Sequence, residues 1–118
     1  MNAILDTCAL LDVMLVGYQP PVEGPWGASA ISWCEIVWKN KLGKLNLGPN
    51  RDDFFKDLQI AGVHPISIEH DLTLAAVDLN WAHRDPADRL IVALAIERQL
   101  PLITRDEHVQ GFYRNCLW

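Results

Sequence analysis

Short apolar runs alternate with helical patterns along most of the chain, and this alternation constrains the fold more than any other feature. The runs with strand character occupy residues 3–5, 63–68, 101–103 and 115–118. Segments with the apolar spacing of helices lie between them. Strands separated by helices are typical of a parallel sheet covered by helices. We therefore expect an α/β layer architecture.

The expected helices cover about residues 29–42, 50–62, 69–79 and 86–99. Ser29 or Ser32 can cap the first helix, and Asn50 can cap the second. Pro86, at a first helical position, opens the clearest helix. Its apolar residues recur at helical spacing and predict one buried stripe, made of Ala87, Leu90, Ile91, Leu94 and Ala95.

An irregular stretch rich in proline and glycine covers about residues 17–27. Its prolines exclude a regular helix there. The segments on either side are too short to fold alone, so we interpret this stretch as a surface loop within a single domain spanning residues 1–118. Trp26, in this loop, is the one tryptophan that we consider for base stacking. Trp33 and Trp38 are expected to pack.

The bulk composition favours an ordinary globular protein. The chain has 118 residues and a net charge of −5. No apolar run approaches the roughly 20 residues of a membrane-spanning helix, so no membrane association is expected. The first residues lack a basic segment and do not resemble a signal peptide, which favours a cytoplasmic protein. Three widely spaced cysteines predict neither a disulfide framework nor a zinc site.

Two aspartates lie at the ends of expected strands. Asp6 directly follows the first strand, and Asp106 follows the run 101–103 by three residues. The carboxyl ends of parallel strands face one crevice, where ligands bind in open α/β sheets. Either residue could instead serve only as a helix cap, because Asp is a preferred N-cap.

Glu35 lies in the middle of an expected helix, on its apolar side. Ile31, Trp38 and Leu42 stand at helical spacing from it, which predicts an inward-facing carboxylate. Burying a lone carboxylate costs several kcal/mol unless it is paired or bound to a metal. A functional site would satisfy it, and so would an ion pair with Arg89.

Asp85 and Asp88 open the helix that begins at Pro86. Both positions suit a carboxylate at the positive end of a helix, and the spacing resembles a capping box. We assign the capping role to Asp85 and the site role to Asp88.

Four converging carboxylates would require a cation. Oxygen ligands without a Cys or His pattern favour Mg²⁺ or Mn²⁺ over zinc. Such ions bind phosphate oxygens and activate water, so this set points towards phosphodiester hydrolysis. Arg84, Arg89 or Arg105 could contact a substrate phosphate or pair with an acid. The four histidines show no ligand spacing, and we expect them on the surface or in packing: His64, His70, His83 and His108.

Five ordered motifs resemble those of PIN domains, and most of all those of VapC-type toxins from bacterial toxin–antitoxin pairs. They cover nearly the whole chain, at residues 4–7, 29–36, 43–45, 83–89 and 102–106. The resemblance implies a three-layer α/β/α fold with a short central parallel sheet, related to the Rossmann architecture. It also implies an endoribonuclease that cleaves single-stranded RNA with Mg²⁺ or Mn²⁺. The implied catalytic and metal-binding residues are Asp6, Glu35, Asp88 and Asp106.

The resemblance extends to other residues and to partners. It places Thr104 as a hydroxyl near the site, and we add Arg89 and Arg84 as substrate-binding candidates. A homodimer and a cognate antitoxin are implied partners. Two features depart from the family: Cys8 stands where many of these toxins have His, and the segment from Asp6 to Glu35 is shorter than usual. The short segment affects the expected partner surface.

Two other functions are possible for such a set of acids. A phospho-acceptor signalling domain also holds Mg²⁺ in an acidic pocket, but it has a second acid beside the first and a late Lys. Here Thr7 follows Asp6, and Arg105 precedes Asp106. A catalytically silent PIN-fold binding partner is the remaining alternative.

Overall fold

The structure is a computed structural model that describes residues 1–118. One or two helices separate each strand from the next: β1 (Ile4–Leu5), α1 (Thr7–Leu15), β2 (Trp26–Ser29), α2 (Ala30–Lys41), α3 (Arg51–Ile60), β3 (Val63–Ile66), α4 (His70–Asp78), α5 (Pro86–Arg98), β4 (Leu102–Ile103), α6 (Glu107–Phe112) and β5 (Cys116–Leu117).

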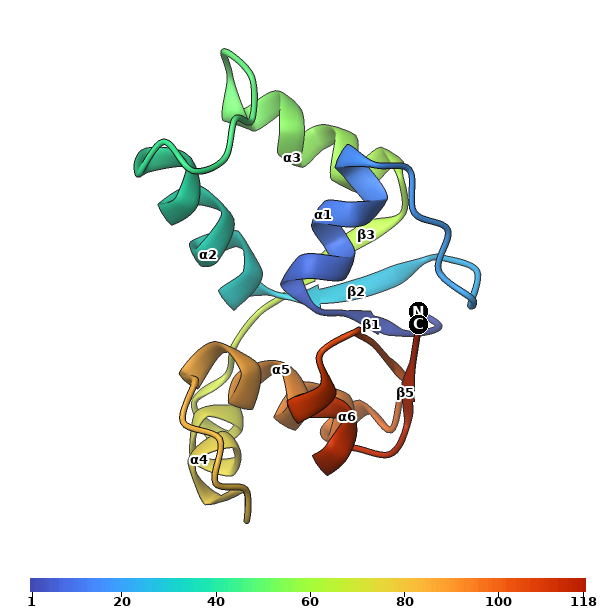
Figure 1. Cartoon of the computed structure of the whole chain (residues 1–118), viewed down its shortest axis with the longest axis vertical. Coiled ribbons are helices and arrows are strands. Elements are labelled where there is room, and N and C mark those ends of the chain that lie inside the picture. The colour runs from blue at the N-terminus through green and yellow to red at the C-terminus, as the bar shows by residue number, and fades with distance from the viewer.

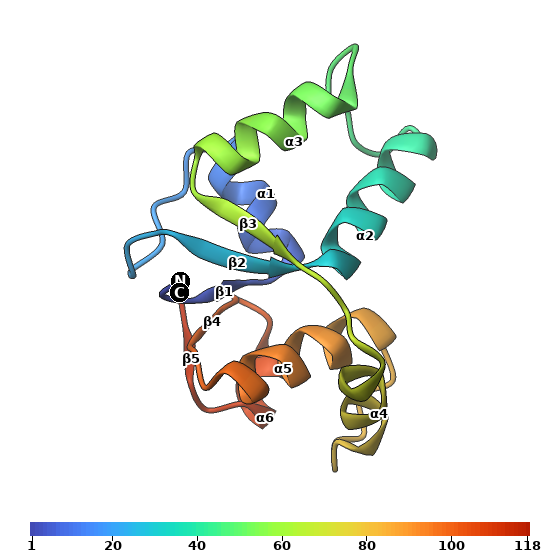
Figure 2. The ribbon, with the colours of Figure 1, turned by 180° about the vertical axis from the view of Figure 1, so that it is seen from behind.

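All five strands form one parallel sheet in the order β3-β2-β1-β4-β5. Ile4 of β1 stands at the centre, opposite Gly27 of β2 and Leu102 of β4. Helices α1, α2 and α3 cover one face of the sheet, and α4, α5 and α6 cover the other (Figures 1 and 2). The α/β/α architecture expected from the sequence is confirmed.

Each face of the sheet has its own apolar core of eleven buried residues. Leu5 and Ile103 point into the core under α1, α2 and α3, whereas Ile4 and Leu102 point into the opposite one. Adjacent residues of β1 and β4 therefore serve opposite layers, as the alternation of side chains along a strand requires. Both strands are thereby buried from both sides, which fixes the positions of their carboxyl ends. No helix combines the length and apolar character that a membrane crossing needs.

The predicted loop over residues 17–27 was wrong for its last two residues, which belong to a strand. Residues 26–29 form β2, which pairs with β1 on one side and β3 on the other. Trp26 is half-buried within this strand, and its indole N–H donates to the Val22 carbonyl at 2.7 Å. The expectation of an exposed Trp26 on a loop was therefore wrong as well. In the run Trp-Gly-Ala-Ser only Trp26 favours a strand, and pairing on both sides stabilises β2.

The predicted helix caps are present. Ser29 accepts a hydrogen bond from the Ile31 N–H, and Asn50 accepts one from the Asp52 N–H. Asp85 accepts from the backbone N–H of Ala87, at the start of α5. Caps depend on local contacts, so the sequence located these three helix starts correctly.

Candidate metal centre

One pocket of about 350 Å³ lies at the carboxyl ends of β1 and β4. All four predicted acids line it, together with a fifth carboxylate and two basic side chains. The complete lining is Asp6, Thr7, Cys8, Glu35, Lys39, Asp85, Asp88, Arg105 and Asp106. The convergence of Asp6 and Asp106, separated by 100 positions in the sequence, follows from the pairing of their two strands.

Asp6 is both a cap and a member of the pocket. Its carboxylate accepts a hydrogen bond from the Ala9 N–H at 2.8 Å and thereby caps α1. Burial raises the pKa of Asp6, and the negative charges of Asp88 and Asp106 raise it further, while hydrogen bonds from Thr104 and Ala9 oppose the shift. The two interpretations of this residue, cap and site, therefore hold together.

Asp106 repeats this arrangement at the end of β4. Its Oδ1 accepts from the N–H of His108 at 2.8 Å and caps α6. Its own N–H donates to the Thr104 hydroxyl at 3.1 Å. Thr104 is fully buried. Because its hydroxyl serves Asp106 and also lowers the pKa of Asp6 through a hydrogen bond, Thr104 orients two acids and does not face a substrate.

Glu35 points into the pocket from α2 and is held there by α1. It accepts a hydrogen bond from the Thr7 hydroxyl at 2.6 Å. Thr7 in turn lies 2.8 Å from the Ser32 hydroxyl. Because the only hydroxyl proton of Thr7 is given to Glu35, Ser32 must be the donor to Thr7. The alternative partner considered for Glu35, Arg89, makes no ion pair with it.

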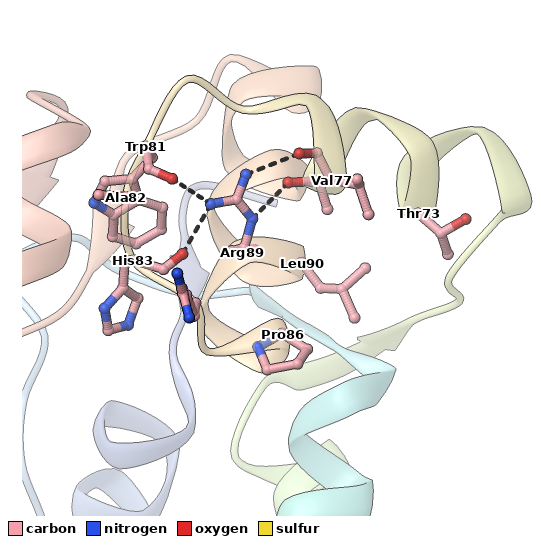
Figure 3. A pocket seen from close by; sticks show the side chains of 10 residues that line it. Thr73, Val77, Trp81, Ala82, His83, Pro86, Arg89 and Leu90 are labelled. Atoms are coloured by element: carbon pink, nitrogen blue, oxygen red, sulfur yellow. Dashed lines mark hydrogen bonds between the residues drawn. The ribbon is translucent and has the colours of Figure 1, made fainter.

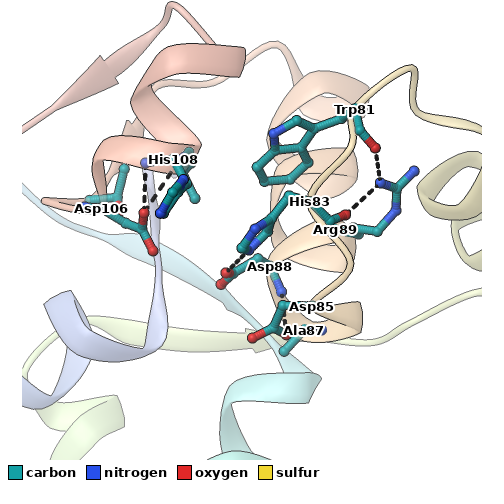
Figure 4. Close-up of polar contacts among 10 residues, drawn as sticks. Trp81, His83, Asp85, Ala87, Asp88, Arg89, Asp106 and His108 are labelled. Carbon is teal, nitrogen blue, oxygen red and sulfur yellow. Dashed lines mark hydrogen bonds and ion pairs between the residues drawn. The ribbon is translucent and has the colours of Figure 1, made fainter.

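Asp88 is bound by a histidine that the sequence did not single out. His83 Nε2 lies 2.7 Å from Asp88 Oδ2 (Figure 4). Burial raises the pKa of Asp88, the hydrogen bond from His83 lowers it, and the charges of Asp85 and Asp106 raise it. His83, Asp85 and Asp88 offer metal-ligand atoms that all lie within 4.8 Å of one another. His83 packs on the ring of Trp81, as expected of a packing residue, but nothing in the sequence indicated its contact with Asp88.

Arg89 is placed differently from the expectation of a substrate-binding residue. All five of its N–H groups donate to backbone carbonyls, at 2.6–3.0 Å. Figure 3 shows the contacts with Val77, Trp81 and His83. The acceptors belong to the end of α4 and to the loop after it: Ala76, Val77, Leu79, Trp81 and His83. No donor is left for a phosphate, so Arg89 holds the backbone that carries His83. The sequence could not reveal this, because none of the five acceptors is a side chain.

The remaining basic groups differ in their access to the acids. Arg84 is exposed and lines a separate cavity of about 650 Å³ between α4 and α5 (Figure 3). Arg105 lines the acidic pocket, pairs with Asp12 at 2.8 Å and lies over the ring of Trp118. Lys39 also lines the pocket. It stands four residues after Glu35 on α2, and this spacing could have identified it.

The lining of the pocket suits a hard divalent cation. Five carboxylates face two basic side chains there, so a net negative charge remains in the pocket. Carboxylate oxygens are the ligands that Mg²⁺ and Mn²⁺ prefer. The raised pKa values of Asp6 and Asp88 indicate that the folded chain holds these charges at a cost. A bound cation would remove that cost, and Asp6, Asp88 and Asp106 are the residues that would hold it.

Comparisons with known proteins identify the family of this chain. The sequence matches the family model of the PIN domain over residues 3–115. No curated protein matches it. Among solved structures, it is similar to a toxin–antitoxin complex from Klebsiella pneumoniae, with a TM-score of 0.67 and 21% identity, covering 99% of this chain and 97% of that one. It is also similar to the structure of VapBC2 from Rickettsia felis bound to a DNA fragment from the VapBC2 promoter. The TM-score is 0.68 and the identity 14%, and the match covers 99% of this chain and 96% of that one.

The two structural neighbours share the α/β/α arrangement over almost their whole length. At identities of 21% and 14% they establish the fold. The family match covers all four predicted acids. The chain therefore belongs to the PIN domain family.

Proposed function

We propose that this PIN domain is a metal-dependent endoribonuclease that hydrolyses single-stranded RNA. The observation that carries the proposal is the acidic pocket, in which five carboxylates converge beside only two basic side chains. PIN domains are generally nucleases, so membership of the family supports a hydrolase acting on nucleic acid. The choice of RNA and of Mg²⁺ or Mn²⁺ is the finer part of the proposal.

The roles of the residues follow from their positions. Asp6, Asp88 and Asp106 would hold the ion, which supplies charge stabilisation at phosphorus and a more acidic bound water. Glu35, kept in place by Thr7, would help to bind the ion or orient the attacking water. Attack in line with the leaving oxygen requires no participation of the RNA 2′-hydroxyl. Cleavage should therefore also proceed on a strand whose 2′-hydroxyl at the cleaved position is methylated.

The substrate contacts are proposed to come from the edge of the pocket. Lys39 and Arg105 line it and carry the charge that a phosphate requires. Arg84 adjoins Asp85 and is exposed, so it can reach a strand that leaves the pocket. Arg89 is not included, because its donors are all engaged.

We further propose that the chain is a VapC-type toxin that acts in the cytoplasm. Its structural neighbours are described as toxin–antitoxin and VapBC2 complexes, which supports an antitoxin as the partner of this chain. A homodimer is the expected assembly. Co-expression with the protein encoded by the adjacent gene, followed by size-exclusion chromatography with light scattering, tests both points.

The test of the nuclease compares the wild-type chain with Asp6→Asn on single-stranded RNA, with Mn²⁺ or with EDTA. Asn can still cap α1, so the variant removes a charge from the pocket and keeps the cap. We expect cleavage to fall at least about 100-fold, because loss of an outer partner of a metal ligand alone costs about 10- to 100-fold. Asp53→Asn, an exposed residue of α3, is the matched control.

Equal cleavage by wild type and Asp6→Asn, or cleavage that persists in EDTA, would contradict the proposal. Complete inactivity of a folded wild-type chain on every RNA tried would favour the silent PIN-fold binding partner.

A further inference from the structure

Four aromatic rings form a stack that leads from the core to the edge of the acidic pocket. In order, they belong to Phe112, Trp81, His83 and His108, and we call them the aromatic stack. Trp81 and Phe112 lie 4.8 Å apart with an interplanar angle of 11°. His83 lies 4.7 Å from Trp81 at 32°, and His108 lies 5.6 Å from His83 at 13°.

The two inner rings of the aromatic stack pack against the core, whereas the outer two lie near the surface. Phe112 and Trp81 pack against the core under α5. His83 is only about one quarter exposed, whereas His108 is exposed and pairs with no ring other than His83. The aromatic stack thus ends in a flat ring with one face open to solvent.

The aromatic stack is held in place by the same contacts that organise the acids. Arg89 donates to the carbonyls of Trp81 and His83, at 2.6 and 2.8 Å. Asp88 binds the ring of His83, and Asp106 accepts from the backbone N–H of His108. The outer two rings therefore border the gap into which Asp88 and Asp106 point (Figure 4). A ligand on His108 would meet a preorganised surface, which lowers the entropic cost of binding.

We propose that the open face of His108 binds one nucleobase of the substrate, in the nucleotide next to the cleaved phosphate. This inference rests on the proposed nuclease function and adds a base-binding subsite to it. A base is the flat group that a phosphate in the acidic pocket would carry with it, one sugar away. Stacking accepts every base, and a purine offers more area than a pyrimidine. The subsite therefore favours a purine at that nucleotide without requiring one.

The first part of the test changes the RNA. In an oligonucleotide with a mapped cleavage site, the base on either side of the cleaved phosphate is replaced by an abasic ribose. We expect kcat/KM to fall roughly 5- to 100-fold at one of the two positions, the range of stacking energies per base. The same abasic substitution several nucleotides away should have little effect.

The second part changes the ring. His108→Gln removes the flat ring but keeps a polar side chain, whereas His108→Phe keeps a ring of similar size. We expect the Gln variant to lose as much kcat/KM as the abasic RNA and the Phe variant to stay within a few-fold of wild type. On the abasic RNA, His108→Gln should cause no further loss, because the contact is already absent. His70→Ala, an exposed histidine of α4, is the control.

Three results would overturn the proposal: abasic substitution without effect at both positions, equal loss in the Gln and Phe variants, or additive losses of variant and abasic site. Thermal melting of each variant confirms that it is folded. The nuclease function would survive these results, because wild-type cleavage is measured in the same assay. If wild type cleaves no RNA, the affinity of the chain for a short fluorescently labelled single-stranded RNA is measured by fluorescence anisotropy in the presence of Ca²⁺. Equal affinity for intact and abasic RNA would then reject the subsite separately.

Discussion

The acidic pocket and the surroundings of Arg89 differ in how far their charged groups are satisfied by hydrogen bonds within the chain. Arg89 carries a positive charge and forms no ion pair with a carboxylate, yet each of its five N–H groups has a carbonyl partner. The pocket carries five carboxylates that are used only in part, by helix caps and by single hydroxyl or imidazole contacts. One region satisfies its charge internally, and the other keeps binding capacity for something outside the chain.

The contrast distinguishes charged side chains that stabilise the fold from charged side chains that are available to a ligand. A charged side chain whose hydrogen-bonding capacity is used up stabilises the fold, because removing it leaves its partners unsatisfied. A carboxylate with free oxygens and a raised pKa destabilises the fold until a ligand arrives. Sequence position alone gives no such distinction, since Asp88 and Arg89 are neighbours. Four experiments test it, in decreasing order of the change that we expect.

Arg89→Met should cause the largest loss of stability. Hydrogen bonds to a charged group contribute about 1.5–3 kcal/mol each, and several of the released carbonyls can bind water instead. We expect the free energy of unfolding to fall by about 3 kcal/mol, measured by urea denaturation. Arg89→Lys should recover part of this loss, since Lys has three donors in place of five. Arg98→Met, exposed on the same helix, should change little. Similar losses at both sites would refute the structural role of Arg89.

Thr7→Val should weaken metal binding far more than it weakens the fold. The Thr7 hydroxyl is the only group that donates to Glu35, at 2.6 Å, and Val preserves its shape. We expect the affinity for Mn²⁺, measured by titration calorimetry, to fall about tenfold, as for other partners that orient ligands. Thr73→Val on α4 is the control, because its hydroxyl donates to the carbonyl of His70 on its own helix and contacts no acid. An unchanged Kd would show that Glu35 needs no support.

Asp6→Asn should stabilise the metal-free chain, with a clear dependence on pH. Burial raises the pKa of Asp6 above its ordinary value of 3.8, so the folded state holds the ionised form at a cost. As the pH falls through the raised pKa, the folded state takes up a proton before the unfolded state does, and this cost disappears. In EDTA at pH 7 we expect the variant to melt about 2–4 °C higher than wild type, and this difference should shrink on acidification.

Saturating Mn²⁺ provides the control for this variant. The ion should stabilise wild type and act much less on Asp6→Asn, which reverses their order of stability. A lower melting temperature for Asp6→Asn in EDTA would contradict the view that the pocket stores unfavourable charge.

Substitutions of the two tyrosines should have the smallest effects on the free energy of unfolding. They compare a hydroxyl that has a hydrogen-bond partner with one that has none. The Tyr113 hydroxyl donates to the Leu100 carbonyl at 2.8 Å, whereas the Tyr18 hydroxyl is buried without any partner. Tyr113→Phe should therefore cost about 1 kcal/mol, and Tyr18→Phe should be neutral or slightly stabilising. Urea denaturation of the pair measures both. A clear loss at Tyr18 would reveal a partner for its hydroxyl in solution.

Much of the fold could be predicted because its signals are local. The buried stripe of α5 and the caps at Ser29, Asn50 and Asp85 depend on residues within one or two helical turns. β2 could not be predicted, because three of its four residues do not favour a strand and the strand depends on pairing with its two neighbours. The same limit explains the misplaced Trp26.

The amino-acid sequence was sufficient to predict most strands and helices, the caps and the four acids proposed for the site. The partners of those acids follow from the packing of the elements in three dimensions. In the structure Thr7 donates a hydrogen bond to Glu35, and His83 is hydrogen-bonded to Asp88. Arg89 donates to backbone carbonyls. The physical reason is that periodicity and capping act within a helix or strand. Hydrogen-bond partners are chosen across elements, by contacts that only the packing of α1, α2, α4 and α5 brings together.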